Sequence, residues 1–233
     1  MKTKVFIDGS AGTTGLQIYE RFAKRDDIEI LQIDEEKRKD NAARKEIINS
    51  SDISFLCLPD AAAVEAVSLI ETPNVRVIDA STAHRTDPAW DYGFPELSAE
   101  HRANIAKSKR VANPGCYASG FISLVYPLVQ AGVLPVDYPL VGHGASGYSG
   151  GGKKMIAAIE GADKTFEMAS PRQYALAQSH KHLPEMQKVC GLRYKPMFNP
   201  IVDDYYCGMV VSVPLITRSL AKKYTPADIH EIL

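Results

Sequence analysis

Short apolar segments alternate with amphipathic ones through the first half of the chain. The segments of strand length cover residues 4–8, 28–33, 53–58 and 75–79. The stretches between them, 14–25, 41–49 and 60–70, predict helices, and Asp60 is expected to cap the third of them. Strands that alternate with helices in this way indicate a parallel sheet covered on both faces, with right-handed crossovers.

The second half of the chain has a different pattern. An apolar helical stretch over 117–130 is followed by a strand around 138–142, a glycine-rich loop over 144–152, a helix over 153–160 and a long strand over 205–215. Thr225 is expected to cap a final helix that begins at Pro226. Because helices and strands are segregated here, we expect an α+β domain. The boundary is placed near Ala112, which gives domains 1–112 and 113–233.

Composition narrows the class of protein. With 233 residues, 45% hydrophobic, and a net charge of -1, the chain is typical of a soluble globular protein and has no general attraction to nucleic acid or anionic membranes. It has no apolar run of roughly 18 residues, and its first residues lead us to expect no secretory signal. The four cysteines are scattered, which argues against a metal site and for a reducing compartment such as the cytoplasm.

A glycine-rich loop follows the first predicted strand. Gly9, Gly12 and Gly15 have the spacing G-x-x-G-x-x-G, and the first predicted helix starts directly afterwards. Such a loop brings backbone N–H groups and a helix N-terminus to a pyrophosphate. Hydroxyl donors stand between the glycines, at Ser10, Thr13 and Thr14. The loop therefore predicts a dinucleotide site, although the same glycines would also suit a turn that only packs a helix on a strand.

The residues after the second strand leave the dinucleotide open. Asp34 stands where an acidic side chain binds a ribose 2′-hydroxyl, which favours NAD. Lys37, Arg38 and Lys39 follow at once and are suited to a 2′-phosphate, which favours NADP. The basic run is equally typical of a solvated helix start.

Cys116 carries the strongest chemical signal. It follows Asn113-Pro114-Gly115 and starts the apolar helix of the second half. A thiolate at a helix N-terminus is stabilised by the positive end of the helix, and the nearby N–H groups, with the Asn113 amide, can stabilise an oxyanion. We interpret Cys116 as a nucleophile, and Cys57, Cys190 and Cys207 as structural residues.

A nucleophilic thiol needs a base, and spacing alone does not select one of the six histidines. The segment His180-Lys181-His182 leads into a helix, where its side chains can project into a cleft. His143 lies in the glycine-rich segment, and His84 follows the strand over 75–79, at the strand ends where ligands gather. Arg85 and Lys153 are candidates for holding a substrate anion by charge.

Five motifs in order along the chain, at residues 9–15, 79–85, 113–120, 147–152 and 180–185, resemble one family. The chain resembles the short-form N-acetyl-gamma-glutamyl-phosphate reductases of arginine biosynthesis, relatives of aspartate-semialdehyde and glyceraldehyde-phosphate dehydrogenases. The resemblance implies an α/β Rossmann domain plus an α+β glyceraldehyde-phosphate-dehydrogenase-like domain. It also implies NADP as cofactor, an acyl phosphate as substrate, and a homo-oligomer, either a dimer or a tetramer.

The resemblance also implies roles for single residues. Cys116 matches the nucleophile, and His180 matches the base. We expect the cofactor to contact Gly9, Ser10, Gly12, Thr13, Thr14, Gly15, Arg38 and Ser81. The substrate is expected to contact Asn113, Arg85, Lys153 and His182.

Two departures from the family are visible. Ser119 stands where the longer form usually has threonine, and family members extend several dozen residues past the position of Leu233, so we expect the second domain to lack its C-terminal end. Three other functions are compatible with parts of the pattern. They are an aspartate-semialdehyde dehydrogenase, a catalytically silent nucleotide-sensing module, and an alcohol dehydrogenase that uses neither Cys116 nor His180.

Overall fold

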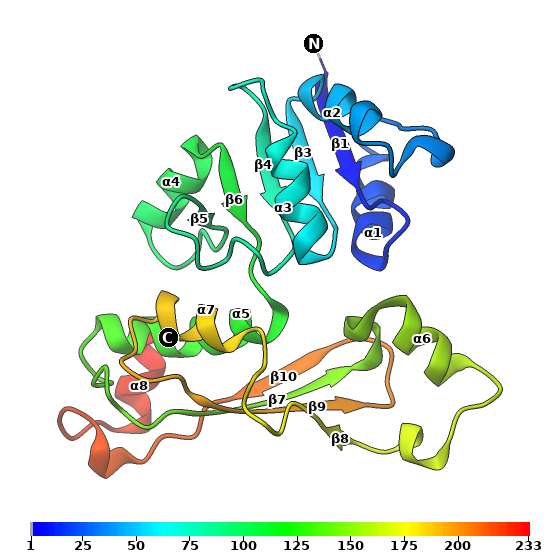
Figure 1. Ribbon diagram of the computed structural model, residues 1–233. Helices are drawn as coiled ribbons and strands as arrows, with labels where there is room; N and C mark the ends of the chain where they lie inside the picture. The colour runs from blue at the N-terminus through cyan, green and yellow to red at the C-terminus, as the bar shows by residue number, and fades with distance from the viewer. Residues whose placement is uncertain (1) are drawn as a thin grey trace. The chain divides into compact units, whose positions relative to one another are not determined.

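The computed structural model describes residues 2–233 and divides into two compact units, Met1–Pro114 and Gly115–Leu233 (Figure 1). The division falls two residues after the boundary placed at Ala112. No helix within residues 2–233 is both long and apolar enough to cross a membrane.

The N-terminal unit is built on a six-stranded parallel sheet with the order β2-β1-β3-β4-β6-β5. Its strands are β1 (Thr3–Asp8), β2 (Ile28–Leu31), β3 (Ile53–Leu56), β4 (Arg76–Asp79), β5 (Asp91–Tyr92) and β6 (Arg110–Ala112). Its helices are α1 (Thr13–Phe22), α2 (Asn41–Asn49), α3 (Asp60–Ser68) and α4 (Ala99–Lys107), with a 3-10 turn over Glu35–Lys37.

Helices cover both faces of this sheet, as the alternating pattern predicts. Ile48 of α2 and Ala63 of α3 belong to the same buried cluster as Phe6 and Leu56 of the sheet. Phe55 points to the opposite face, where its ring meets that of Phe22 in α1 at 5.3 Å. The strand order reverses between β1 and β3, and in such sheets ligands bind at the carboxyl ends of the strands around that point.

Two local predictions in this unit are wrong. The residue that caps α3 is Pro59, with no side-chain hydrogen bond, because the Asp60 carboxylate instead accepts from the backbone N–H of Thr82 (2.8 Å) in the loop after β4. The strand predicted over 28–33 already ends at Leu31, so Asp34 does not follow the strand directly and instead precedes the 3-10 turn.

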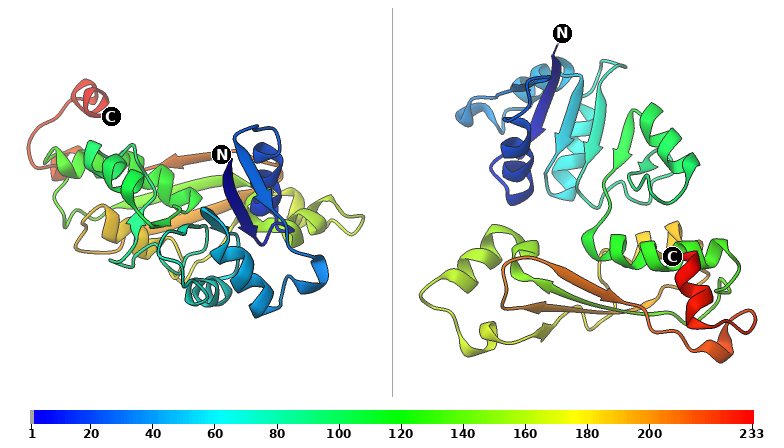
Figure 2. Two further views of the ribbon diagram at one scale, coloured as in Figure 1. Left: turned by 90° about the horizontal axis from the view of Figure 1, so that it is seen from above. Right: turned by 180° about the vertical axis from the view of Figure 1, so that it is seen from behind.

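The C-terminal unit combines a mixed sheet with helices, which confirms the α+β prediction. The sheet order is β10-β7-β9-β8, with β7 and β9 parallel and the outer pairs antiparallel. Its elements are α5 (Cys116–Gln130), β7 (Val141–Gly147), α6 (Gly152–Glu160), β8 (Arg172–Gln173), α7 (Leu183–Val189), β9 (Met197–Asp203), β10 (Met209–Ser212) and α8 (Pro226–Ile232). Helix α5 packs on α7 and α8 and along β10 (Figures 1 and 2).

Strand limits in this unit differ from those the sequence predicts. The predicted long strand over 205–215 shrinks to β10, because residues 205–208 form the turn after β9 and end at Gly208, which has a φ of +119°. The sequence pattern predicts no strand at the position of β9, in which Phe198, Pro200 and Val202 are buried. Thr225 does cap α8, in a reciprocal capping box with Asp228.

Part of the predicted glycine-rich loop is strand rather than loop. Gly144 lies in β7, and the ring of Tyr117 packs directly over it. A Cβ at this position would lie 2.5 Å from two ring carbons. We expect Gly144→Ala to lower the free energy of unfolding by about 1–3 kcal/mol in urea titrations, since the ring would have to move. Gly150→Ala is the matched control, because nothing lies within 4 Å of its added Cβ. Equal urea midpoints for the two variants would contradict this assignment.

Candidate active site

Cys116 is the first residue of α5 and is exposed to solvent. The capping residue Gly115 is extended, and no side chain caps this end of the helix, so backbone N–H groups face outward beside the sulfur. Cys57 and Cys190 differ from it, because burial raises the pKa of these thiols to about 11 and about 12. Thus Cys116 is accessible at a helix N-terminus, as the sequence predicts.

A buried carboxylate anchors the turn before Cys116. Glu185 in α7 is only 1% exposed, and its Oε2 accepts from the backbone N–H of Gly115 (3.2 Å). Its Oε1 lies 3.9 Å from Nε2 of His182, which is also buried. No role is predicted for Glu185 from the sequence. The feature that could have pointed to this role is its spacing of three residues from His182, which puts both side chains on one face of the helix.

An aromatic and imidazole cluster surrounds the second residue of α5. The ring of Tyr117 contacts those of His180 (5.9 Å between centroids), His182 (6.1 Å) and Phe198 (5.2 Å). The ring of Tyr174 contacts that of His180 at 5.7 Å. Burial raises the pKa of Tyr174 strongly, and a hydrogen bond to Tyr117 and electrostatic interaction with Cys116 raise it further. The Tyr174 hydroxyl is therefore protonated and within electrostatic reach of Cys116.

The two nitrogens of His180 have different surroundings. Its Nδ1 accepts from the backbone N–H of His182 (3.1 Å), and its Nε2 lies 3.5 Å from the Tyr174 hydroxyl oxygen. Burial, and then the positive charge of Lys181, lower the pKa of His180. The ring is thus held neutral near pH 7 with its proton on Nε2, which makes His180 a donor toward the site.

The glycine loop of the N-terminal unit has the shape that a pyrophosphate needs. Gly9 has a φ of +85°, and a Cβ there would lie 2.3 Å from the carbonyl oxygen of Cys57. Gly12 caps α1 without a side-chain hydrogen bond, so the N–H groups of the first turn, which starts at Thr13 and Thr14, are available to an anion. A pocket of about 250 Å³ is lined by Ser10 and Tyr19, among others. These residues fit a dinucleotide.

Two predicted cofactor residues have other partners in the structure. Arg38 is exposed and pairs with Glu35 (3.2 Å), and Lys37 pairs with Asp34 (3.6 Å). Ser81 is buried, and its hydroxyl donates to Asp79 (2.6 Å). Their roles toward the cofactor remain predictions.

The predicted substrate residues fall in both units. Arg85 donates to the carbonyl oxygens of Asn113 (2.9 Å) and Ala80 (3.1 Å), which ties the loop after β4 to the end of the unit. Lys153 is exposed in the first turn of α6. His182 is 4% exposed, so its burial favours a positioning role over direct contact.

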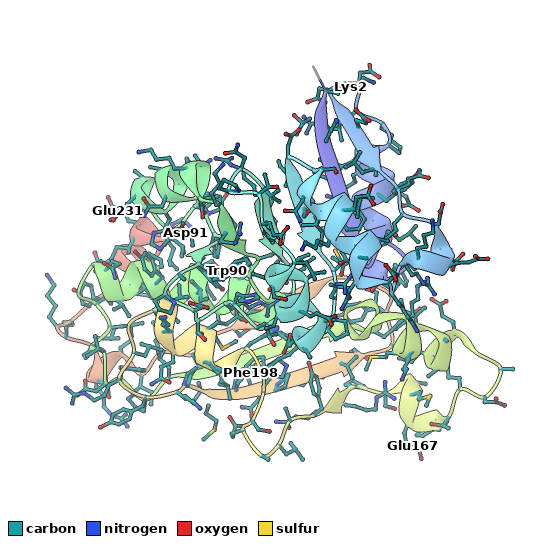
Figure 3. All side chains as sticks on the ribbon, turned by 45° about the horizontal axis from the view of Figure 1, so that its top comes forward. Lys2, Trp90, Asp91, Glu167, Phe198 and Glu231 are labelled. Atoms are coloured by element: carbon teal, nitrogen blue, oxygen red, sulfur yellow. The ribbon has the colours of Figure 1, made fainter. Side chains whose placement is uncertain are left out.

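The other two histidine candidates have other surroundings. His84 belongs to the N-terminal unit, where it bonds to Asp79 (2.6 Å) and stacks on Trp90, a residue labelled in Figure 3. His143 is exposed on β7. Across residues 2–233, no group of three or more His, Cys, Asp or Glu side chains is placed to hold a metal ion.

Comparison with protein families matches both halves of the chain. Residues 9–105 match the model described as semialdehyde dehydrogenase, NAD binding domain, and residues 116–233 match semialdehyde dehydrogenase, dimerisation domain. The chain is thus a semialdehyde dehydrogenase in the broad sense. The second model also indicates that it assembles as a homo-oligomer.

Solved structures share the fold at low sequence identity. Aspartate semialdehyde dehydrogenase from Francisella tularensis superposes with a TM-score of 0.70 at 13% identity, covering 99% of this chain and 79% of that one. A probable aspartate-semialdehyde dehydrogenase from Pseudomonas aeruginosa gives 0.70 at 17% identity, covering 100% and 79%. These matches confirm the predicted pairing of a Rossmann-type unit with an α+β unit.

Sequence relatives narrow the family. N-acetyl-gamma-glutamyl-phosphate reductase of Burkholderia cenocepacia is 49% identical over 229 residues, which cover 98% of this chain and 73% of that protein. N-acetyl-gamma-glutamyl-phosphate reductase 2 of Pseudomonas putida is 52% identical over 218 residues, covering 93% and 69%. The chain belongs to the N-acetyl-gamma-glutamyl-phosphate reductase family, as the five motifs predict.

Proposed function

We propose that this protein reduces N-acetyl-L-glutamyl 5-phosphate to N-acetyl-L-glutamate 5-semialdehyde with NADPH, through a thioester on Cys116, in arginine biosynthesis. The relatives at about half identity carry the name of this reaction. The observation that carries the proposal within the chain is an exposed cysteine at the uncapped N-terminus of a 15-residue helix, whose second residue, Tyr117, contacts the ring of His180. This arrangement suits nucleophilic attack on an acyl group.

The first chemical step takes place at the start of α5. The Cys116 thiolate attacks the carbonyl carbon of the acyl phosphate, the carbon–oxygen bond to phosphate breaks, and inorganic phosphate leaves with the bonding electrons. The N–H groups of the first turn of α5 stabilise the negative oxygen that develops during attack. Glu185 supports this step from behind, because its bond to Gly115 fixes the turn that aims the sulfur.

The cofactor is assigned to the glycine loop. Gly9, Gly12 and Gly15 let the backbone approach the pyrophosphate, Ser10, Thr13 and Thr14 add donors, and Arg38 is assigned to the 2′-phosphate. When bound, NADPH supplies the hydride that converts the thioester carbon to the aldehyde oxidation level.

His180 is assigned the role of acid toward the forming aldehyde oxygen in the second step. Its Nε2–H donates a hydrogen bond to the negative oxygen that forms when hydride reaches the thioester carbon, and the proton stays on Nε2. The carbonyl then forms again as the carbon–sulfur bond breaks, so the aldehyde leaves and Cys116 is released as thiolate. The bond between His182 N–H and Nδ1 favours this donor role. The further role as base toward the Cys116 thiol requires the other neutral tautomer, with the proton on Nδ1 and the lone pair on Nε2.

Several assignments rest on chemistry alone. Arg85 and Lys153 are proposed to bind the phosphate or carboxylate of the substrate, and Asn113 to assist the oxyanion. A dimer or tetramer in the cytoplasm is proposed on the same basis as the reaction, the likeness to the family.

The test is a substrate panel in the reverse direction, with phosphate and NADP, read as NADPH absorbance. We expect kcat/KM for N-acetylglutamate semialdehyde to exceed that for aspartate semialdehyde by about 10²-fold or more, since a site built for an acetylated amino group leaves polar groups unpaired with the free amine. A preference for aspartate semialdehyde would replace the proposed substrate. Absence of turnover with every aldehyde, together with NADP binding, would favour the nucleotide-sensing module.

A further inference from the structure

Residues 174–182 carry two of the site's groups, Tyr174 and His180, on a segment without helix or strand. Two residues of this segment have left-handed backbone conformations, Ala175 with a φ of 52° and Gln178 with a φ of 54°. They are the only non-glycine residues with positive φ between residues 2 and 233. Side chains disfavour this conformation, and it persists where surrounding contacts impose it. The backbone N–H of Gln178 closes the turn on the carbonyl of Ala175 (3.0 Å).

The side chain of Gln178 is the contact that holds this turn. Its Nε2 donates to the carbonyl oxygen of Phe198 (2.9 Å), and its Oε1 accepts from the backbone N–H of the same residue (2.7 Å). Both hydrogen bonds are made to the edge of β9 on which β8 pairs. The pairing with β8 ends at Gln173, opposite Ile201, and the last backbone hydrogen bond along this edge runs from the N–H of Tyr174 to the carbonyl of Pro200. The backbone of Phe198 therefore lies beyond the paired part of this edge. The amide of Gln178 thus continues the ladder by one rung after the strand has ended.

Phe198, whose backbone Gln178 holds, also packs against the rings of the imidazole cluster. Phe198, labelled on the sheet in Figure 3, is 1% exposed, and its ring packs against those of His180 (5.1 Å) and Tyr117 (5.2 Å). The clamp therefore ties the segment that delivers Tyr174 and His180 to the strand that supports their rings. If the turn relaxed out of its left-handed conformation, Tyr174 and His180 would move away from the ring of Phe198.

We propose that Gln178 is a positioning residue, whose bidentate amide clamp on Phe198 holds Tyr174 and His180 facing each other beside Cys116. This inference rests on the proposed function for its kinetic consequence, but its geometric consequence is independent of any substrate. Without the clamp, the thiolate of Cys116 loses a fixed arrangement of donors around it.

The main test compares Gln178→Met, which keeps the length of the side chain and removes both hydrogen bonds, with Gln187→Met. Gln187 is a matched control, because its amide also donates to a backbone carbonyl of the same unit, that of Arg193 (3.0 Å). We expect Gln178→Met to lower kcat in the reductase assay by about 10–100-fold with less than about a threefold change in the KM for NADP. Iodoacetamide should alkylate its Cys116 several-fold more slowly at pH 7.5, and Gln187→Met should match wild type in both measurements.

A second variant covers the case in which Gln178→Met fails to fold. Gln178→Glu keeps an acceptor for the N–H of Phe198 but, when ionised, presents an oxygen to its carbonyl. A protonated glutamic acid restores the donor. We therefore expect the alkylation rate and the kcat of Gln178→Glu, each divided by the wild-type value at the same pH, to rise as the pH falls from 8 to 5.

The two readouts separate the two proposals. If the wild-type protein has no reductase activity, the proposed reaction is refuted. The rate of Cys116 alkylation then still tests whether Gln178 positions Tyr174 and His180. Wild-type kcat and alkylation rate in Gln178→Met, or ratios for Gln178→Glu that do not change with pH, would overturn the positioning role.

Discussion

Cys116→Ser is expected to lower kcat/KM of the reverse reaction by at least about 10³-fold, with little change in the urea midpoint. A serine hydroxyl remains protonated near pH 7 and is a much weaker nucleophile than a thiolate, and its ester is a poorer hydride acceptor than a thioester. Because Cys116 is exposed, the substitution leaves no cavity and no buried polar group without a partner. The measurement is the initial rate of NADPH formation, with circular dichroism to confirm folding.

Cys207→Ser is the control for this experiment. Cys207 is the other exposed cysteine of the described chain and lies in the turn between β9 and β10, away from α5 in sequence and without a role in the mechanism. It should retain wild-type activity. If the Cys116→Ser enzyme keeps most of its activity, the thioester route is refuted. Hydride transfer would then proceed without a covalent intermediate on Cys116.

Arg44→Met is expected to destabilise the protein by about 3–5 kcal/mol, since it strands a buried carboxylate. The guanidinium of Arg44 donates twice to Oδ2 of Asp8 (3.1 and 2.9 Å), and the two side chains are 6% and 7% exposed. Asp8 is the last residue of β1, directly before Gly9, so the pair anchors the phosphate loop. The loss would be measured as the free energy of unfolding in urea, and we expect weaker NADP binding to accompany it.

The next residue of the same helix supplies the control. Lys45 pairs with Glu71 (2.7 Å) at the surface, with side chains 44% and 70% exposed, so Lys45→Met should cost at most about 1 kcal/mol. The double variant Asp8→Leu/Arg44→Met should regain much of the stability lost in Arg44→Met, because no unpaired charge remains. Equal losses in Arg44→Met and Lys45→Met would show that the buried pair has no special importance.

The pH dependence of this loss has a defined sign. Burial already raises the pKa of Asp8 in the folded protein, even though Arg44 lowers it. Without Arg44 the folded pKa rises further above the unfolded value, so the folded state binds more protons than the unfolded state between the two values. Stability of the variant therefore increases as pH falls through the folded pKa of Asp8, and its deficit relative to wild type should narrow.

The amino-acid sequence by itself determined where the glycine loop and Cys116 lie relative to the strands and helices. Gly9 and Gly12 lie between β1 and α1, Gly15 lies in the first turn of α1, and Cys116 starts α5. These positions follow from local rules of chain geometry and helix termini. The alternation of strands and helices in the first half likewise predicts a parallel sheet without any knowledge of long-range contacts. The family motifs then indicated the reaction. Local physical arguments had left open the choice between NAD and NADP and had not excluded three other functions.

Tertiary structure decided which side chains meet. Glu185 reaches Gly115 across 70 positions of sequence, Tyr174 is brought to Tyr117 and His180, and Gln178 finds the backbone of Phe198. The strand β9 was missed because Asn199-Pro200 has the composition of a turn, while its pairing with β7 and the burial of Phe198 override that preference. A hydrogen bond between distant residues depends on where the whole chain places them, so no local pattern carries its signal.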